Sequence, residues 1–98
     1  MAKHPCAYIL ASGKCGYIYI GVTSDMAARY HQHLEDTFEG FAKRRNCKRL
    51  VHIEMFATMD EAITREKQLK NWHRDWKIEL VEGENPEWRD LGLEMGLR

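Results

Sequence analysis

The sequence predicts an α+β domain, in which two strands and a helix precede a third strand and further helices. Two apolar runs, residues 6–11 and 17–22, have the length of strands and are separated by a short loop with two glycines. Apolar residues then recur every four positions from Met26, which is the spacing of one helix face. A chain of 98 residues with 44% hydrophobic residues is enough for one domain with its own core.

The first two strands are expected to pair antiparallel, because the loop 12–16 is too short for a crossover connection. In the second strand Tyr17 and Tyr19 share one face, while Ile18 and Ile20 share the other. One face of this strand therefore carries phenol groups, and the opposite face is apolar.

The first helix is predicted over about residues 25–36. Gly21 allows the chain to turn after the strand, and residues 23–25 offer side-chain oxygens that cap free N–H groups at a helix start. Arg29 and His33 are four positions apart and project from one face of this helix. The pattern thus brings a cation and an imidazole close to the end of the tyrosine-bearing strand.

The second half of the chain predicts one more strand and two helices. Residues 37–47 form a connection with room for a helical turn, and residues 48–56 supply the apolar content of a third strand. A helix is expected to start near Thr58. Residues 71–74 are expected to kink or divide it, which leaves a shorter helix that ends near Glu82.

The residues around this turn resemble the GIY-YIG nuclease signature. Tyr19-Ile20-Gly21 is the second half of the signature, and Tyr8 stands ten intervening residues earlier, where the family places its first tyrosine. Arg29 and His33 stand at the positions of the family's arginine and histidine. Cys6-Ala7-Tyr8 replaces Gly-Ile-Tyr, a variation that is common in the small stand-alone bacterial (YhbQ-like) members.

The resemblance implies a three-stranded antiparallel sheet flanked by helices, in the order ββαβαα, across residues 6–82. It implies a GIY-YIG nuclease-like domain over residues 1–82, with residues 83–98 as an acidic tail that packs on the domain or trails from it. It also implies a metal-dependent endonuclease that hydrolyses DNA phosphodiester bonds with structure-selective or weak sequence-specific choice of target. DNA is the expected partner, and the sequence does not distinguish it from RNA.

The resemblance also implies a role for each residue of the site. His33 would accept a proton near neutral pH, while Tyr8 and Tyr19 would orient the attacking water and pass its proton towards His33. Arg29 would hold phosphate oxygens with its planar fork of donors. Glu66 would hold one Mg²⁺ or Mn²⁺ ion, which would stabilise the 3′ leaving oxygen.

Glu66 is also unusual by its position alone. One predicted helical stripe, with steps of three or four, contains Ile63, Glu66, Leu69, His73, Trp76 and Leu80. A carboxylate on a core-facing stripe needs a partner, because burying it unpaired is costly. Lys70, one turn later, is one candidate, and a divalent cation shared with substrate phosphate is the other. The spacing alone favours the ion pair, whereas the resemblance favours the metal.

The formal net charge is zero, which argues against indiscriminate nucleic-acid binding. Residues 79–98 carry a balance of −4, so the first 78 residues carry +4. Five positive charges lie within seven positions, at Lys43, Arg44, Arg45, Lys48 and Arg49. These residues form either a solvated loop or a patch that contacts the DNA backbone, and the resemblance favours the patch. Target choice would come from this loop, from DNA shape or from a protein partner.

The remaining candidates are expected to be structural. The three cysteines are interpreted as free thiols, because their spacing does not match a zinc site. His31 and His52 are expected to be surface or edge residues. The tryptophans, which are expected to form core or clasp contacts rather than base-stacking platforms, are Trp72, Trp76 and Trp88. Asn71 and Asn85 stay open as the asparagine that the family often adds after the glutamate.

Two alternatives to a nuclease stay open at this point. One is a nucleic-acid-binding or DNA-repair accessory module that does not turn over, and the other is an interaction adaptor on the same scaffold. The apolar runs are too short to cross a bilayer, and no secretion signal is visible, so a cytoplasmic protein without membrane contact is expected.

Overall fold

The computed structural model describes residues 4–35 and 40–97. The predicted end of the first helix and the start of the connection after it fall on residues 36–39 and lie outside the described residues. The elements in chain order are β1 (Cys6–Ala11), β2 (Ile18–Thr23), α1 (Met26–Leu34), α2 (Phe41–Arg44), β3 (Arg49–Met55), α3 (Met59–Asn71), α4 (Arg74–Glu84) and α5 (Leu91–Glu94). Across the described ranges, no helix combines the length and apolar content needed to span a bilayer.

The three strands form one antiparallel sheet in the order β2-β1-β3, which confirms the predicted fold class. β1 is the central strand, and all six of its residues are buried. Tyr8 pairs with Gly21 of β2 on one side and with Ile53 of β3 on the other. The first predicted tyrosine therefore lies in the middle of the sheet, directly beside Gly21. The expected turn at Gly21 is wrong, because β2 continues through this glycine to Thr23.

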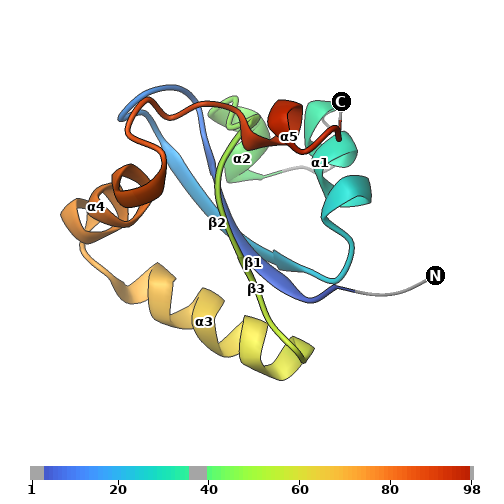
Figure 1. The fold of residues 1–98 in the computed structure, drawn as a ribbon. Coiled ribbons are helices and arrows are strands. Elements are labelled where there is room, and N and C mark those ends of the chain that lie inside the picture. The colour runs from blue at the N-terminus through green and yellow to red at the C-terminus, as the bar shows by residue number, and fades with distance from the viewer. Residues whose placement is uncertain (1–3, 36–39, 98) are drawn as a thin grey trace.

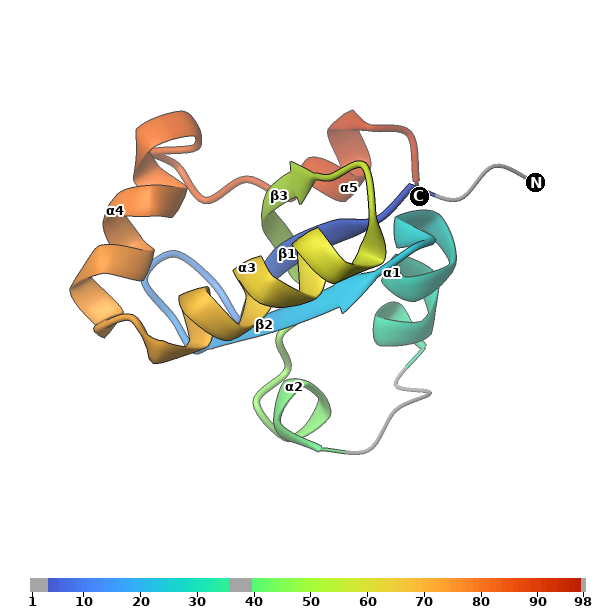
Figure 2. The same ribbon diagram turned by 90° about the horizontal axis from the view of Figure 1, so that it is seen from below.

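Helices cover both faces of the sheet (Figure 1). On one face, Tyr8 and Leu10 pack against Met26 and Tyr30 of α1. On the other face, the alternate side chains of β1 and β2 pack against α3, α4 and Trp88. Figure 2 shows α3 along β2, which is an edge strand of the sheet. The edge at β2 therefore lies between α1 on one face and α3 on the other.

The predicted starts of α1 and α3 are confirmed by their caps. The Asp25 carboxylate accepts a hydrogen bond from the backbone N–H three residues later, and the Thr58 hydroxyl does the same for α3. Trp72 has extended backbone angles (φ −71°, ψ 150°), which ends α3 before α4 begins at Arg74. The predicted division of the long helix is therefore confirmed.

Three expectations about side-chain surroundings are wrong. The stripe from Ile63 to Leu80 is not continuous, because the break at Trp72 places its later members on the separate helix α4. Trp76 is 52% exposed and so belongs to neither core nor clasp. His52 lies on the outer strand β3 but is only 3% exposed, so it is not a surface residue, and its Nε2 lies 2.8 Å from Glu54 Oε2.

The chain after α4 returns across the sheet and packs on both layers. Trp88 is fully buried, and its indole N–H donates to Glu82 Oε2 at 2.7 Å. The Asp90 carboxylate accepts from the Tyr30 hydroxyl of α1 at 2.7 Å and from the backbone N–H of Leu50 in β3 at 3.2 Å. This segment therefore joins α1 to the outer strand β3.

Candidate active site

The two central tyrosines come from neighbouring strands. Tyr8 of β1 lies opposite Gly21 of β2, and Tyr19 lies two residues before Gly21 on the same face. A Cβ atom at Gly21 would lie 2.4 Å from the hydroxyl oxygen of Tyr8. The glycine is therefore required for space, because any side chain there would displace the Tyr8 phenol. Tyr8 is fully buried, whereas Tyr19 is partly exposed.

Helix α1 supplies the imidazole. Its apolar stripe buries Met26 and Tyr30 against the sheet, which turns His33 towards the tyrosines. The hydroxyl oxygen of Tyr8 and Nε2 of His33 lie 3.1 Å apart, within hydrogen-bond distance. A residue of the first strand thus contacts a residue 25 positions later.

Tyr8, Tyr19 and His33 form a compact group, called here the ring cluster. The ring centroids lie 6.3 Å apart for the two tyrosines, 6.0 Å for Tyr8 and His33, and 5.5 Å for Tyr19 and His33. These are contact distances for aromatic pairs. β1, β2 and α1 each contribute one ring, so the antiparallel pairing of β1 with β2 and the connection from β2 to α1 bring the three rings together.

Burial and Arg29 set the protonation states in this cluster. Burial raises the pKa of Tyr8 well above its ordinary value, and the neighbouring Tyr19 adds to the rise, while the Arg29 guanidinium opposes it. Burial lowers the pKa of His33, and the charge of Arg29 lowers it further. At neutral pH, Tyr8 is therefore a protonated phenol, and His33 is a neutral imidazole that can accept a proton.

Glu66 lies on α3, which packs against the opposite face of the sheet and along β2. Its side chain is 15% exposed, and Oε2 lies 3.4 Å from Nζ of Lys70. Lys70 also lines a hollow of about 240 Å³ at the edge of β2, together with Ile18, Tyr19, Ile20 and Lys77. The Glu66 carboxylate therefore contacts a lysine that lines the same hollow as Tyr19. The carboxylate itself is not part of the ring cluster.

A match to a known family model identifies the family of this chain. The sequence model described as the GIY-YIG catalytic domain matches residues 4–79, which contain the ring cluster, Arg29 and Glu66. The chain belongs to the GIY-YIG family. This is a nuclease-type family, so its domain implies a nucleic-acid substrate. Its members typically use a divalent metal.

Curated relatives support the small stand-alone branch of the GIY-YIG family. A UPF0213 protein of Staphylococcus haemolyticus is 34% identical over 82 residues, covering 84% of this chain and 98% of the relative. A UPF0213 protein of Staphylococcus aureus is 34% identical over 70 residues, covering 69% of this chain and 85% of the relative. No solved structure gives a significant match.

Glu66 can bind only a metal ion that takes most of its ligands from water and substrate. Within residues 4–35 and 40–97, no three His, Cys, Asp or Glu side chains are grouped as a metal cage. Glu66 is a single carboxylate that already has Lys70 as its partner. Mg²⁺ is suited to such a site, since it keeps several waters and binds through one or two carboxylates and substrate phosphates.

The five residues of the predicted basic patch have different surroundings. Lys43, Arg44 and Arg45 are exposed, and the Arg45 guanidinium lies 4.7 Å from the centre of the Tyr17 ring. Lys48 is partly buried. Arg49 donates to the carbonyl of Trp88 at 2.9 Å, so its guanidinium holds the C-terminal segment.

Asn85 is a structural residue in this fold. Its side-chain amide donates to the carbonyls of Val51 and Arg89 at 3.2 and 2.9 Å, and it is almost fully buried. Asn71 lies exposed at the end of α3. The amide of Asn85 is thus committed to backbone carbonyls, which leaves Asn71 as the accessible one of the two asparagines.

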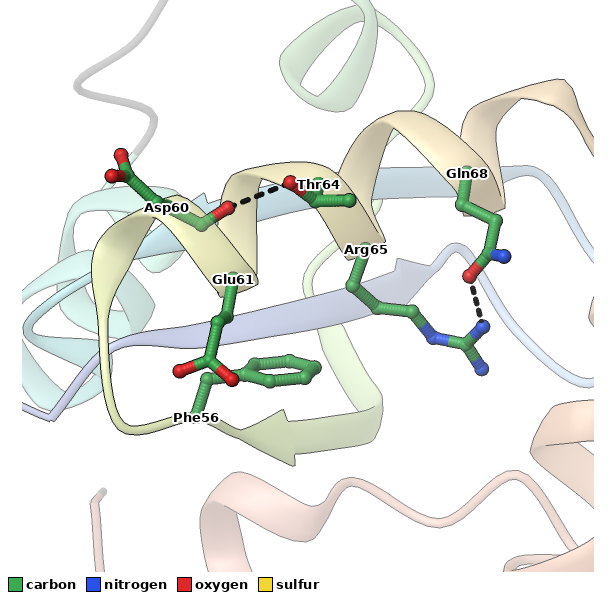
Figure 3. A pocket seen from close by; sticks show the side chains of 6 residues that line it. All are labelled: Phe56, Asp60, Glu61, Thr64, Arg65 and Gln68. Carbon is green, nitrogen blue, oxygen red and sulfur yellow. Dashed lines mark hydrogen bonds between the residues drawn. The ribbon is translucent and has the colours of Figure 1, made fainter.

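The sequence did not predict a second polar network, which joins α3 to β3. Arg65 Nε donates to Glu54 Oε1 at 2.8 Å, and the same carboxylate contacts His52. Burial raises the pKa of Glu54, but hydrogen bonds and charge from Arg65 and His52 outweigh it, so the pKa is lowered. A hollow of about 390 Å³ beside this network (Figure 3) is lined by Phe56, Asp60, Glu61, Thr64, Arg65 and Gln68. No residue of the predicted site lines it.

Proposed function

We propose that this protein is a metal-dependent endonuclease that hydrolyses DNA phosphodiester bonds, with structure-selective or weakly sequence-specific choice of target. The observation that carries the proposal is the contact of 3.1 Å between the Tyr8 hydroxyl and His33, with the Tyr19 ring against both. Hydrolysis of a phosphodiester needs a positioned water, a group that accepts its proton and positive charge near the phosphate. The ring cluster and Arg29 supply these groups in a nuclease-type family.

The exposure of each ring assigns its role. Tyr19 is partly exposed, so its phenol contacts and orients the attacking water. His33, neutral at pH 7, accepts the proton of that water. Tyr8 is buried and protonated, so it acts as a positioning residue whose hydroxyl fixes the orientation of the His33 ring.

Two further residues act on the phosphate. Arg29 donates to its oxygens from a planar fork of N–H groups that matches their geometry. Glu66 would hold Mg²⁺ or Mn²⁺ in place of its ion pair with Lys70. When bound, such an ion supplies Lewis-acid stabilisation of the 3′ leaving oxygen.

A binding role without turnover is the second candidate function. The net charge of zero and the ion pair between Lys70 and Glu66 favour it, because Lys70 occupies the carboxylate that would hold the metal. In that case the chain would serve as an accessory module for DNA repair in the cytoplasm, with a protein partner supplying specificity.

Cleavage assays separate the two candidates. Wild type, Glu66→Ala and Tyr19→Phe are incubated with branched, single-stranded and duplex DNA and with RNA, in Mg²⁺ or Mn²⁺. We expect metal-dependent nicking by the wild type that is lost in both variants. Tyr17→Phe, at the residue just before β2, is the matched control and should nick normally, because Tyr17 lies outside the ring cluster. Binding by the wild type without nicking in any metal would support the accessory role instead.

A further inference from the structure

Trp72 and Trp76 meet at the junction of α3 and α4. Their ring centroids are 5.9 Å apart with an interplanar angle of 85°, and the His73 ring lies 5.3 Å from Trp76 on the same junction. Trp76 is 52% exposed, although tryptophan is the side chain with the largest apolar surface to bury. Three aromatic rings from five consecutive residues therefore present an open aromatic surface.

Trp72, which forms one wall of a hollow, is held in place by Arg65. The Arg65 guanidinium lies 4.9 Å from the centre of the Trp72 ring, and Arg65 is itself fixed by Glu54 at 2.8 Å. A hollow of about 490 Å³ opens beside this wall and is lined by Trp72, Trp76, Glu79 and Leu80. Because one indole is fixed before any ligand arrives, little conformational entropy is lost when a flat ligand packs on the pair.

Cations connect this hollow to the candidate active site. Lys77 follows Trp76 directly in α4, and Lys70 lies two residues before Trp72. Both lysines line the neighbouring hollow together with Tyr19. A strand that follows both hollows would meet ammonium groups at one and indoles at the other, which is the combination of positive charge and aromatic surface that proteins use to bind single strands.

We propose that the hollow between Trp72 and Trp76 binds an unpaired nucleobase of the same strand that is cut beside Tyr19. This inference rests on the proposed function and defines its substrate class. A base in a duplex is stacked and paired, so it cannot enter the hollow, whereas a base in a single strand or at a branch can. The protein would then select single-stranded or branched nucleic acid by stacking.

Binding without cleavage tests this site. The wild-type protein is titrated with a thymidine oligonucleotide, alone or paired with its complement, in EDTA, and tryptophan fluorescence and affinity are recorded. We expect quenching by the single strand and little by the duplex. Trp76→Ala should weaken single-strand binding about 5- to 150-fold, the value of one base stack, and Trp76→Phe should restore most of it. Leu93→Ala removes an equally exposed apolar side chain of α5 and should change nothing.

The outcomes distinguish this inference from the proposed function. Equal single-strand affinity of the wild type and Trp76→Ala, or duplex binding as tight as single-strand binding, would overturn the stacking site even if the protein cuts DNA. Loss of affinity in Trp76→Ala together with absence of nicking by the wild type would overturn the nuclease and keep the stacking site. Tyr19→Phe and Glu66→Ala should retain the quenching, because neither residue lines the hollow.

Discussion

At the scale of single residues, a missing side chain and a buried phenol depend on each other. Gly21 leaves the space that the Tyr8 ring occupies, and the position of that ring fixes the contact with His33. Arg29 then acts on both groups, since it opposes the rise in the pKa of Tyr8 and adds to the fall in the pKa of His33. Burial and this charge together keep the imidazole neutral, while burial keeps the phenol protonated in spite of the charge.

Gly21→Ala tests the space beside Tyr8. The added methyl group would lie 2.4 Å from the phenol, so the ring must move and the contact with His33 must break. Overpacking of this kind costs about 1–3 kcal/mol in the free energy of unfolding, measured by chemical denaturation, and nicking should fall with it. Gly83→Ala is the matched control, because Gly83 lies in α4 with open space around it and should be stabilised by about 0.5–1 kcal/mol. Equal effects of the two changes would contradict the account of Gly21.

The lowered pKa of His33 sets the pH dependence. The imidazole is neutral above its pKa, so the rate of nicking should be level at neutral pH and fall only below pH 6.5. The free energy of unfolding should also fall as the pH falls. The unfolded chain binds the proton at a higher pH than the folded protein, so stability is lost from pH 6.5 down to the lower pKa of the folded state.

Arg29→Gln separates charge from burial at His33. Removing the guanidinium removes the second cause of the lowered pKa, so an NMR titration should show a rise in the pKa of His33. Arg89→Gln, which removes an arginine paired with Glu94 in the C-terminal segment, should leave that pKa unchanged. A pKa of His33 that is the same in all three proteins would mean that Arg29 does not act on the imidazole.

At the scale of elements, the sequence predicted what depends on local pattern. The strand β1, the caps at Asp25 and Thr58 and the break near Trp72 follow from apolar period and from capping chemistry. It did not predict the environment of His52 or the exposure of Trp76, because these depend on which helix packs on which face after the break. The ring cluster became predictable only through the family signature, since spacing shows that side chains can meet and not that they do.

The C-terminal segment gives a test at this scale. Asp90 accepts hydrogen bonds from the Tyr30 hydroxyl and from the backbone N–H groups of Leu50 and Gly92. Asp90→Ala leaves these donors without their acceptor and should lower the free energy of unfolding by about 1–3 kcal/mol, measured by urea denaturation. Glu87→Ala, which removes an exposed partner of Lys14 at 3.5 Å, should have little effect, because exposed ion pairs contribute little. If the two variants unfold alike, the segment does not join α1 to β3 as described.

At the scale of the whole molecule, charge is separated although the total is zero. The last twenty residues carry −4, and three exposed basic residues, Lys43, Arg44 and Arg45, lie together at the end of α2. Neutral overall charge limits non-specific binding, so contact with the DNA backbone must come from local patches. Under the proposed function, this distribution would favour choice of target by shape rather than by general attraction.

Charge reversal tests the basic patch. The double variant Arg44→Glu, Arg45→Glu should weaken DNA binding and flatten the dependence of the logarithm of affinity on the logarithm of salt concentration by about 2, since each phosphate contact contributes about 0.9. The control reverses two charges elsewhere, at Lys14 and Arg89, which are both more than half exposed. An equal change in slope for both double variants would mean that only net charge matters and that the patch is ordinary solvated surface.

Under the proposed function, the ring cluster and Glu66 act on the same phosphate from opposite sides of the β2 edge. A double-mutant cycle of Tyr19→Phe and Glu66→Gln, read as the single-turnover rate of Mg²⁺-dependent nicking, tests it most directly. Residues that act as a unit give strongly non-additive losses, so each single variant should lose nearly as much activity as the double variant. Losses that multiply, or a Glu66→Gln variant that nicks at the wild-type rate, would contradict the claim.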